Sequence, residues 1–426
     1  MPAQLSGLSL LHEYDPAQKK LTLHGASQFP RELLDFASDI EILDMSFGKL
    51  STLPDDFGRL QALRVAFFSF NLFTEVPRVL ATCPKLEFIG MRSCRIASWA
   101  EDALPPSLQA ITLTENELTS VPSSLAKLPH LRKLLLTGNR LRNLPPALEN
   151  CRQLECIRLC VNEFSASPES LLARLPKLFC YADSGNPFSE HILAPAGNMP
   201  SVTWGEIHIG EKIGESAKNA VFRAEYRGGA VAMKVFGNAI TTDGLPDDEI
   251  RAALAAGEHS ALVSATTRVL GMPDDKQAVL MPLIPPSFAP LGLPPDLHTY
   301  SRDTFGPEHQ FSLAFITGVL RDVASGLQHL HSRGVMHGDV YAHNILANRE
   351  GQAYLCDFGS ACIYQPNQSS VREYIDVRGF GVLIEDLLSR CTETGKQREH
   401  LDALEQACCL AEPNRRPRFR DIVKEL

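Results

Sequence analysis

Two short segments late in the chain carry the residue types that phosphoryl transfer needs. The segment HGDVYAHN occupies residues 337–344, and DFG follows at 357–359. A strand–turn–strand pattern lies between them, so Asp339, Asn344 and Asp357 are expected at adjacent strand ends. Asp339 is the candidate to accept the hydroxyl proton or orient the nucleophile. Asn344 and Asp357 offer the hard oxygen ligands that Mg²⁺ prefers.

A lysine earlier in the chain completes this set. Lys234 ends the run VAMK in an apolar strand pattern, and a lysine there needs a partner. The run resembles the V-A-I-K motif, which implies that Lys234 pairs with the α- and β-phosphates of a nucleotide. Glu249, at the start of a helical stretch over 250–256, is the preferred ion-pair acid, and Asp248 is a close competitor.

Three strands and a loop are expected to position this lysine. The strands are predicted over 207–212, 220–226 and 230–236, with a hairpin turn at 227–229. The loop between the first two keeps Gly214 and Val221 of a glycine-rich phosphate loop, with Ser216 at its second glycine position. A small residue there still lets the backbone approach phosphates. An ordinary hairpin is the alternative reading of this loop alone.

The catalytic segment follows a long amphipathic helix, predicted over 311–333. Its apolar residues recur at helical spacing and form one stripe. They are Leu313, Ile316, Leu320, Val323, Leu327 and Leu330.

Taken together, these motifs resemble the eukaryotic-type protein kinase family over residues 203–426. The segment DVRGFGV at 376–382 and the ending RPRF at 416–419 resemble two further family motifs. The resemblance implies an α+β two-lobed fold that uses ATP and Mg²⁺. It also implies that Ala232, Met281 and Leu283 contact the nucleotide, with Met281 as gatekeeper and Leu283 bonding adenine.

The sequence departs from the family pattern at informative positions. Gly338 replaces the arginine that couples the site to a phosphorylated activation loop, so activity independent of loop phosphorylation is expected. Tyr341 replaces the lysine usual in serine/threonine kinases, which leaves the hydroxyl specificity open. The segment between Asp357 and Asp376 is short and lacks an A-P-E motif.

The first half of the chain repeats with a period near 23 residues. Apolar residues recur as L-x-x-L-x-L-x-x-N-x-L, and each unit can bury its face only against the next. The turn position holds Asn71, Asn116, Asn139, Asn162 and Asn186, with Gly48 and Cys94 as departures. This half resembles the leucine-rich-repeat family over roughly residues 15–190, which implies an α/β solenoid.

One apolar cluster is expected on the concave face of the repeats. It comprises Ile42, Val65, Phe67 and Phe88. Exposed apolar clusters mark interaction sites, so these residues are candidates for binding a protein substrate or regulator. Contact with an N-terminal cap or with the second half of the chain is the alternative.

Composition excludes several classes of function. A net charge of -9 argues against nucleic-acid binding. The uncharged stretch 278–295 contains six prolines, so it is read as a connection and no membrane span is expected. Eleven scattered cysteines without zinc-ligand spacing indicate reduced thiols and a cytoplasmic protein.

The sequence therefore predicts leucine-rich repeats with caps over 1–190, a linker over 191–202 and a kinase-like domain over 203–426. The expected activity is ATP- and Mg²⁺-dependent transfer to a protein hydroxyl, with serine/threonine favoured. The spelling HGD also resembles small-molecule phosphotransferases of the aminoglycoside and choline kinase type, which is the first alternative. A nucleotide-binding pseudokinase scaffold is the second.

Overall fold

The computed structural model describes residues 14–190, 199–215, 219–237, 239–366 and 370–426, and the side chains of Phe36 and Glu190 are outside this description. The chain divides into two compact units. The first comprises Met1–Ile157 and Asn162–Phe164, and the second comprises Arg158–Val161 and Ser165–Leu426. Each unit is described by itself.

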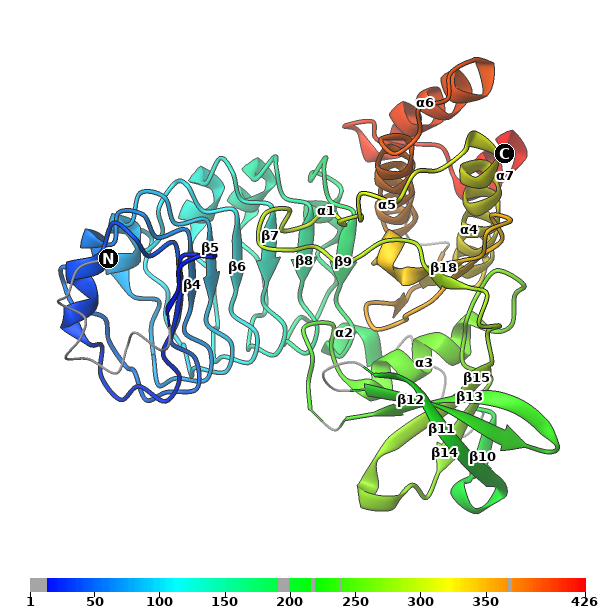
Figure 1. Ribbon diagram of the computed structural model, residues 1–426, viewed down its shortest axis with the longest axis horizontal. Coiled ribbons are helices and arrows are strands. Elements are labelled where there is room, and N and C mark those ends of the chain that lie inside the picture. Colours follow the sequence, from blue (N-terminus) through cyan, green and yellow to red (C-terminus); the bar gives the residue numbers. More distant parts are fainter. Residues whose placement is uncertain (1–13, 191–198, 216–218, 238, 367–369) are drawn as a thin grey trace. The chain divides into compact units, whose positions relative to one another are not determined.

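The first unit consists of short strands that lie side by side in chain order (Figure 1). β1 and β2 are antiparallel, and the strands from β2 to β7 are parallel and in register. The strands are β1 Tyr14–Asp15, β2 Lys20–Thr22, β3 Ile42–Asp44, β4 Val65–Phe67, β5 Phe88–Gly90, β6 Ala110–Thr112, β7 Lys133–Leu135 and β8 Cys156–Arg158, whose last residue belongs to the second unit. Short 3-10 turns connect them at Arg31–Phe36, Phe57–Arg59, Arg78–Thr82, Ser123–Lys127 and Pro146–Asn150.

Buried asparagines tie neighbouring repeats together, as the repeat pattern predicts. Asn139 is representative: its Oδ1 accepts from the amide of Leu118 (3.0 Å), and its Nδ2 donates to the carbonyls of Leu113 and Leu136 (both 2.9 Å). The side chain thus satisfies backbone groups that the turn leaves unpaired. The residue before each turn position has a positive φ, at Phe47, Phe70, Ser93, Glu115, Gly138, Val161 and Gly185.

Both departures from asparagine have a structural reason. A Cβ on Gly48 would lie 2.5 Å from the carbonyl oxygen of Ala26, so a larger side chain does not fit. Cys94 donates from Sγ to the carbonyl of Phe68 (3.2 Å), as an asparagine amide would. The repeat is therefore maintained at these positions by other means.

The second unit begins with residues that continue the repeats. Its β9, Cys180–Ala182, follows α1, Glu169–Leu172, and precedes α2, Pro187–Glu190. The amide of Leu159 donates to Ala182 (2.8 Å), and the amide of Val161 donates to Ser184 (2.8 Å). We call residues 158–161 and 165–190 the terminal repeat segment.

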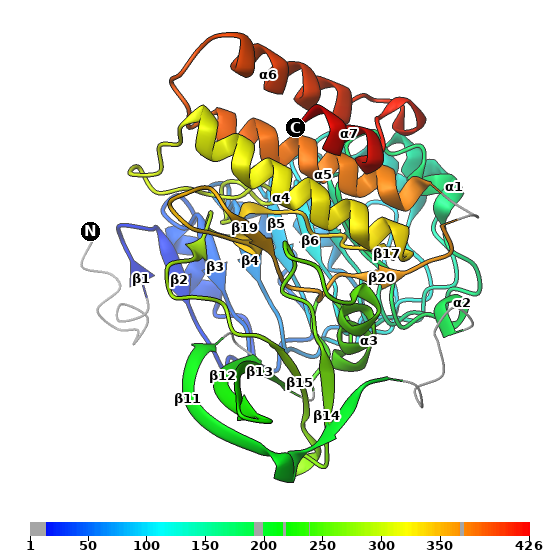
Figure 2. The same cartoon turned by 90° about the vertical axis from the view of Figure 1, so that its right-hand side faces the viewer.

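A curved sheet with one helix beside it forms the next part of the second unit (Figure 2). The strand order is β10-β14-β15-β13-β12-β11, and only the β10–β14 pair is parallel. The elements are β10 Ser201–Thr203, β11 Ile207–Glu215, β12 Asn219–Tyr226, β13 Gly229–Phe236, α3 Pro246–Ala256, β14 Thr267–Leu270 and β15 Gln277–Pro282. The three predicted strands are thus present, and each is longer than expected.

The remainder is helical, with two small sheets (Figure 2). Its helices are α4 Leu313–Ser332, α5 Val371–Leu388, α6 Lys396–Cys408 and α7 Phe419–Glu425. Its strands are β16 Ala289–Pro290, β17 Val335–Met336, β18 Ile345–Ala347, β19 Ala353–Leu355 and β20 Cys362–Ile363. Every residue of the predicted α4 stripe is buried, and Ser312 caps the helix by accepting from the amide of Phe315.

The cysteines and the helices bear on two expectations drawn from the composition. All eleven cysteines are free, as reduced thiols require. Within the described residues, no helix combines the length and the apolarity that crossing a membrane would require.

Candidate active site

The sheet and α3 bring Lys234 and Glu249 together. Lys234 lies in β13, between Val221 of β12 and Val279 of β15 in the register of the sheet. Its Nζ bonds Oε1 of Glu249 at 2.5 Å and lies 3.6 Å from Oδ1 of Asp357. Burial by itself would lower the pKa of Lys234, but the carboxylates of Asp357 and Glu249 outweigh it and raise that pKa. The lysine is therefore held charged.

Asp248, the competing acid, lies one residue earlier in α3 and has a different environment. Its Oδ2 is buried and has no hydrogen-bond partner within the described part of the chain. Burial raises the pKa of Asp248 to about 6, with a further contribution from neighbouring Asp247. The ion pair of Lys234 is with Glu249 rather than with Asp248, so the geometry favours Glu249 as its partner.

A buried aspartate in α5 fixes the segment that carries Asp339. Asp376 is fully buried and accepts from the amides of His337 and Gly338 (both 2.8 Å) and from Nε2 of His331 (2.9 Å). Three donors compensate the desolvation of this carboxylate. Sequence reasoning identified the motif around Asp376 but missed His331, because a histidine within an amphipathic helix gives no distinctive signal.

Asp339, Asn344 and Asp357, the residues predicted to act on phosphate, lie near one another. Nδ2 of Asn344 donates to Oδ2 of Asp339 at 2.9 Å and to its carbonyl at 3.0 Å. The amide oxygen of Asn344 is therefore the atom that can face a cation. Asp357 adopts a left-handed conformation (φ 63°) with its side chain 53% exposed.

The donor set fits a hard divalent cation. Asn344 and Asp357 provide oxygen atoms, and Asp357 is accessible enough to take a further ligand. Within the described ranges, no group of three or more His, Cys, Asp or Glu side chains forms a closed metal site. A cation here would thus depend on phosphate or water oxygens for its remaining ligands.

An arginine that sequence reasoning did not identify as a site residue binds Asp339. Arg158, from the terminal repeat segment, bonds Oδ1 of Asp339 through Nη2 at 2.6 Å. Burial would raise the pKa of Asp339, yet the guanidinium of Arg158 holds it below its usual value. The only sequence signal was an arginine in a repeat strand, and such residues are ordinarily solvated.

The predicted nucleotide-contacting residues lie on neighbouring strands. Gly214 and Val221 face each other across β11 and β12, and buried Ala232 faces Met281 across β13 and β15. Leu283 directly follows β15. Ser216 lies outside the described residues. Phe358 contacts His337, with ring centroids 5.6 Å apart.

The apolar cluster on the repeats is less exposed than expected. Val65 is 1% exposed, because it lies in the ladder between the larger residues Ile42 and Phe88, and those two and Phe67 are half-buried. Val65 therefore cannot contact a partner in this conformation, which corrects that part of the prediction. The rings of Phe67 and Phe88 contact each other, with centroids 5.2 Å apart.

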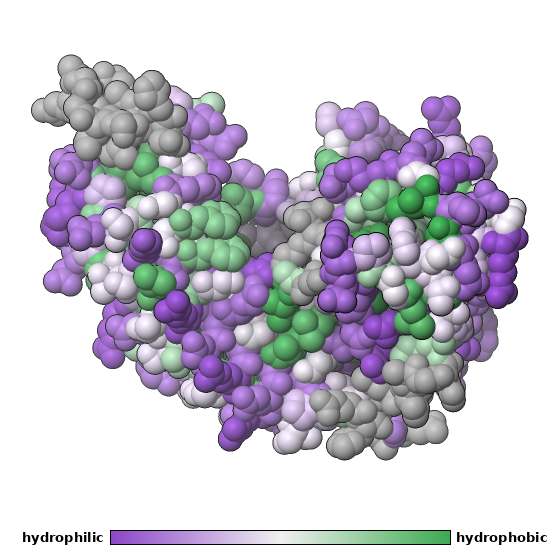
Figure 3. Space-filling view, turned by 90° about the horizontal axis from the view of Figure 1, so that it is seen from below, coloured by the Kyte–Doolittle hydropathy of each residue, from purple (hydrophilic) through white to green (hydrophobic). Residues whose placement is uncertain are grey.

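Other apolar residues of the same unit are more accessible. Phe47 is 59% exposed and Phe70 is 42% exposed. Their rings stack, with centroids 4.8 Å apart. One face of the molecule shows apolar side chains gathered in patches among hydrophilic ones (Figure 3). The stacked pair was not predicted, because it lies in the turns rather than in the strands.

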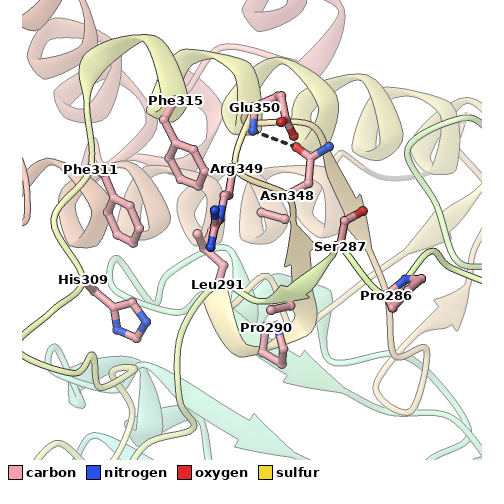
Figure 4. A pocket seen from close by; sticks show the side chains of 12 residues that line it. Pro286, Ser287, Pro290, Leu291, His309, Phe311, Phe315, Asn348, Arg349 and Glu350 are labelled. Carbon is pink, nitrogen blue, oxygen red and sulfur yellow. Dashed lines mark hydrogen bonds between the residues drawn. The ribbon is translucent and has the colours of Figure 1, made fainter.

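A separate pocket of about 620 Å³ lies in the second unit, at the start of α4 and the β18–β19 turn (Figure 4). Phe311, which precedes α4, and Phe315 of α4 line it on one side, and Arg349 and Glu350 line it on another. The amide of Glu350 donates to Oδ1 of Asn348, which shapes the turn. None of the predicted catalytic residues lines this pocket.

Comparison with known proteins matches two regions of the chain. Residues 207–380 match the protein kinase domain, and residues 130–151 match the leucine-rich repeat. The chain contains a protein kinase domain preceded by leucine-rich repeats. The predicted kinase motifs at Lys234, Asp339, Asn344 and Asp357 all fall within the matched range.

Three curated kinases illustrate the similarity. A serine/threonine/tyrosine-protein kinase of Arabidopsis thaliana is 25% identical over 50% of this chain and 57% of its own length. The megakaryocyte-associated tyrosine-protein kinase of Mus musculus is 26% identical over 56% of this chain and 52% of its own. The probable serine/threonine-protein kinase glkA of Dictyostelium discoideum is 30% identical over 28% and 24%. The chain thus spans little more than half of these relatives at most.

Proposed function

We propose that this protein is an ATP- and Mg²⁺-dependent protein kinase that transfers a phosphoryl group to a serine or threonine hydroxyl. The observation that carries the proposal is the arrangement of five polar side chains. Lys234 bonds Glu249 and lies near Asp357, while Asn344 bonds Asp339. Protein kinases use this combination of groups for phosphoryl transfer.

Each residue has a distinct role in this proposal. Lys234, held charged by Glu249, would bind the α- and β-phosphates of ATP. Asn344 and Asp357 would hold Mg²⁺, which supplies charge neutralisation of the phosphates when bound. Asp339 would orient the acceptor hydroxyl and take its proton.

The nucleotide would lie between the strands of the sheet and the helical part of the kinase domain. Gly214 and Ser216 would approach the phosphates, and Val221 and Ala232 would cover the adenine ring. Met281 and Leu283 would lie at the opposite side of the adenine ring, and the backbone of Leu283 would form hydrogen bonds with adenine. Support comes from the register, which puts Val221 opposite Lys234 and Ala232 opposite Met281.

We further propose that the repeats form an α/β solenoid that selects protein partners. In this proposal, repeats and caps occupy 1–190, a linker 191–202 and the kinase domain 203–426, in a cytoplasmic protein. The parallel, in-register strands and the asparagine bonds support stacking of repeats. Leucine-rich repeats are typical of protein–protein interaction.

The kinase proposal is tested by transfer of labelled phosphate from ATP. Wild type should label itself or a generic protein acceptor in the presence of Mg²⁺, and Asp339→Ala should lower that activity by about 10²- to 10⁴-fold. Asp296→Ala, in an exposed loop, is the matched control and should keep it. Labelling confined to amino-alcohol small molecules would instead support the small-molecule phosphotransferase. Nucleotide binding without any transfer would support the pseudokinase scaffold.

The partner proposal is tested on the surface of the repeats. Phe67→Asp and Phe88→Asp should abolish capture of a partner, because charge in a half-buried aromatic pair opposes an apolar contact. Thr112→Asp, in the same column of the sheet as Phe67, is the control. Equal capture by all variants would reject the cluster as a binding site.

A further inference from the structure

Within one compact unit, the terminal repeat segment lies directly on residues 337–344, which we call the catalytic loop. Cys180 of β9 forms an antiparallel bridge with Asp339. The amide of Tyr181 donates to the carbonyl of Gly338 at 2.9 Å. A strand of the repeats therefore pairs with the backbone that presents the proposed catalytic aspartate.

Arg158 connects this segment to acids from two parts of the kinase domain. Besides its bond to Asp339, it lies 3.1 Å from Oδ1 of Asp243, which precedes α3, and donates to the carbonyl of Gly338 at 3.3 Å. Its side chain is only 6% exposed. A buried guanidinium with two carboxylate partners is expected to hold both firmly.

Both carboxylate oxygens of Asp339 already accept hydrogen bonds. Oδ1 accepts from Arg158 and from Sγ of Cys180 (3.4 Å), and Oδ2 accepts from Asn344. The side chain of Asp339 is 18% exposed. An acceptor hydroxyl must come within hydrogen-bond reach of this carboxylate, and Arg158 and β9 occupy the approach to Oδ1.

Gly338 shows that this contact is built into the sequence. It has a φ of +74°, and a Cβ at this position would lie 2.3 Å from the carbonyl oxygen of Tyr181. Any larger residue would push β9 away from the loop. The departure from the kinase pattern at this position thus has a structural reason, which is the close approach of the terminal strand.

Aromatic and ionic contacts reinforce the position of β9. Phe179 packs against Tyr341, the second departure from the kinase pattern, with ring centroids 5.4 Å apart. Asp183, which follows β9, forms a buried ion pair with Arg372 of α5 at 2.7 Å. These contacts therefore hold the chain just before and just after β9.

We propose that the terminal repeat segment is an autoinhibitory element, in which Arg158 and β9 occupy the catalytic aspartate until the segment moves away. This regulation rests on the proposed kinase function. The terminal repeat segment thereby controls phosphoryl transfer directly. Release of Arg158 frees Asp339 for the acceptor hydroxyl and leaves Asn344 in place.

The test compares phosphate transfer from ATP to a generic protein acceptor by full-length variants. Arg158→Met keeps most of the side-chain length but removes the charge, and it should raise kcat/KM by about tenfold or more. Asp243→Asn removes one anchor of the arginine and should give a smaller rise. Arg132→Met is the matched control: it removes a repeat arginine that pairs with Glu155 instead, and should leave the rate unchanged.

Hydrogen exchange provides a second readout that does not need catalysis. In Arg158→Met, the amide of Tyr181 should exchange at least about tenfold faster, because its bond to Gly338 opens more often. If wild type transfers phosphate and both Arg158→Met and Asp243→Asn transfer it at the same rate or more slowly, autoinhibition is overturned and Arg158 has a positioning role. Unchanged exchange at Tyr181 would also overturn it. No transfer by any variant would overturn the kinase function itself, and the regulation with it.

Discussion

Replacing Asp248 by asparagine should stabilise the protein at neutral pH without loss of kinase activity. Asp248 has a buried carboxylate oxygen without a hydrogen-bond partner among the described residues. Its neighbour Glu249 bonds Lys234. The two acids are adjacent in the sequence, so substituting each tests whether the structure assigns them correctly.

The magnitude follows from the shifted ionisation. Burial raises the pKa of Asp248 from 3.8 to about 6 in the folded state. At about 1.4 kcal/mol per pKa unit, this corresponds to at most about 3 kcal/mol, and we expect about 1–3 kcal/mol. Because the folded pKa is raised, the folded state binds the proton more tightly. Stability is therefore lost as pH rises from about 4 to 6 and is constant above that range.

Urea unfolding at a series of pH values measures this effect. A Trp99→Phe background leaves Trp204, in the second unit, as the fluorescent reporter. Asp248→Asn should gain its full stability above pH 6 and little of it near pH 4. Asp247→Asn is the control and should lose stability, because Asp247 pairs with Arg251 (2.5 Å) and Arg268 (2.8 Å).

Two results would refute this reasoning. The first is a gain in stability for Asp248→Asn that does not change with pH, since ionisation would then not be its cause. The second concerns activity. If Asp248→Asn lost phosphate transfer while Glu249→Gln kept it, Asp248 rather than Glu249 would be the partner of Lys234.

Two further predictions concern the repeats and the regulation of the site. Asn139→Leu should destabilise the first unit by about 2–3 kcal/mol, because three backbone groups would lose their partner. Calorimetry measures this, with half-buried Glu117→Ala, which loses only a surface ion pair, as the control, and an unchanged transition would contradict it. Treatment with phosphatase should leave kinase activity largely intact, because Gly338 cannot couple the site to a phosphorylated loop; loss of most activity would disprove this.

Much of the kinase domain was predictable from local patterns. The amphipathic stripe of α4 predicts a buried helix face, and the residues from Leu313 to Leu330 on that stripe are buried. Strand alternation located β11, β12 and β13. Motif order indicated the kinase domain itself, which the family match bears out. These features depend on residues close in the sequence, so periodicity and spacing suffice to find them.

Exposure within the repeats was harder to predict. The repeat spacing locates each strand, but Val65 is buried because of the size of its neighbours in adjacent strands. The stacked pair Phe47–Phe70 arises from residues with positive φ in consecutive turns. Side-chain accessibility depends on how neighbouring repeats pack, and a single repeat does not contain that information.

The sequence by itself determined which groups are available for phosphoryl transfer and in which order they occur. The tertiary structure alone decided what faces Asp339. Arg158 lies 181 residues before it in the chain, and no local pattern links the two. Beside this contact, β9 pairs with the same loop, where Gly338 permits the close approach and the ion pair between Asp183 and Arg372 reinforces it. Such a contact depends on the packing of distant segments, because burial and charge pairing act through space rather than along the chain.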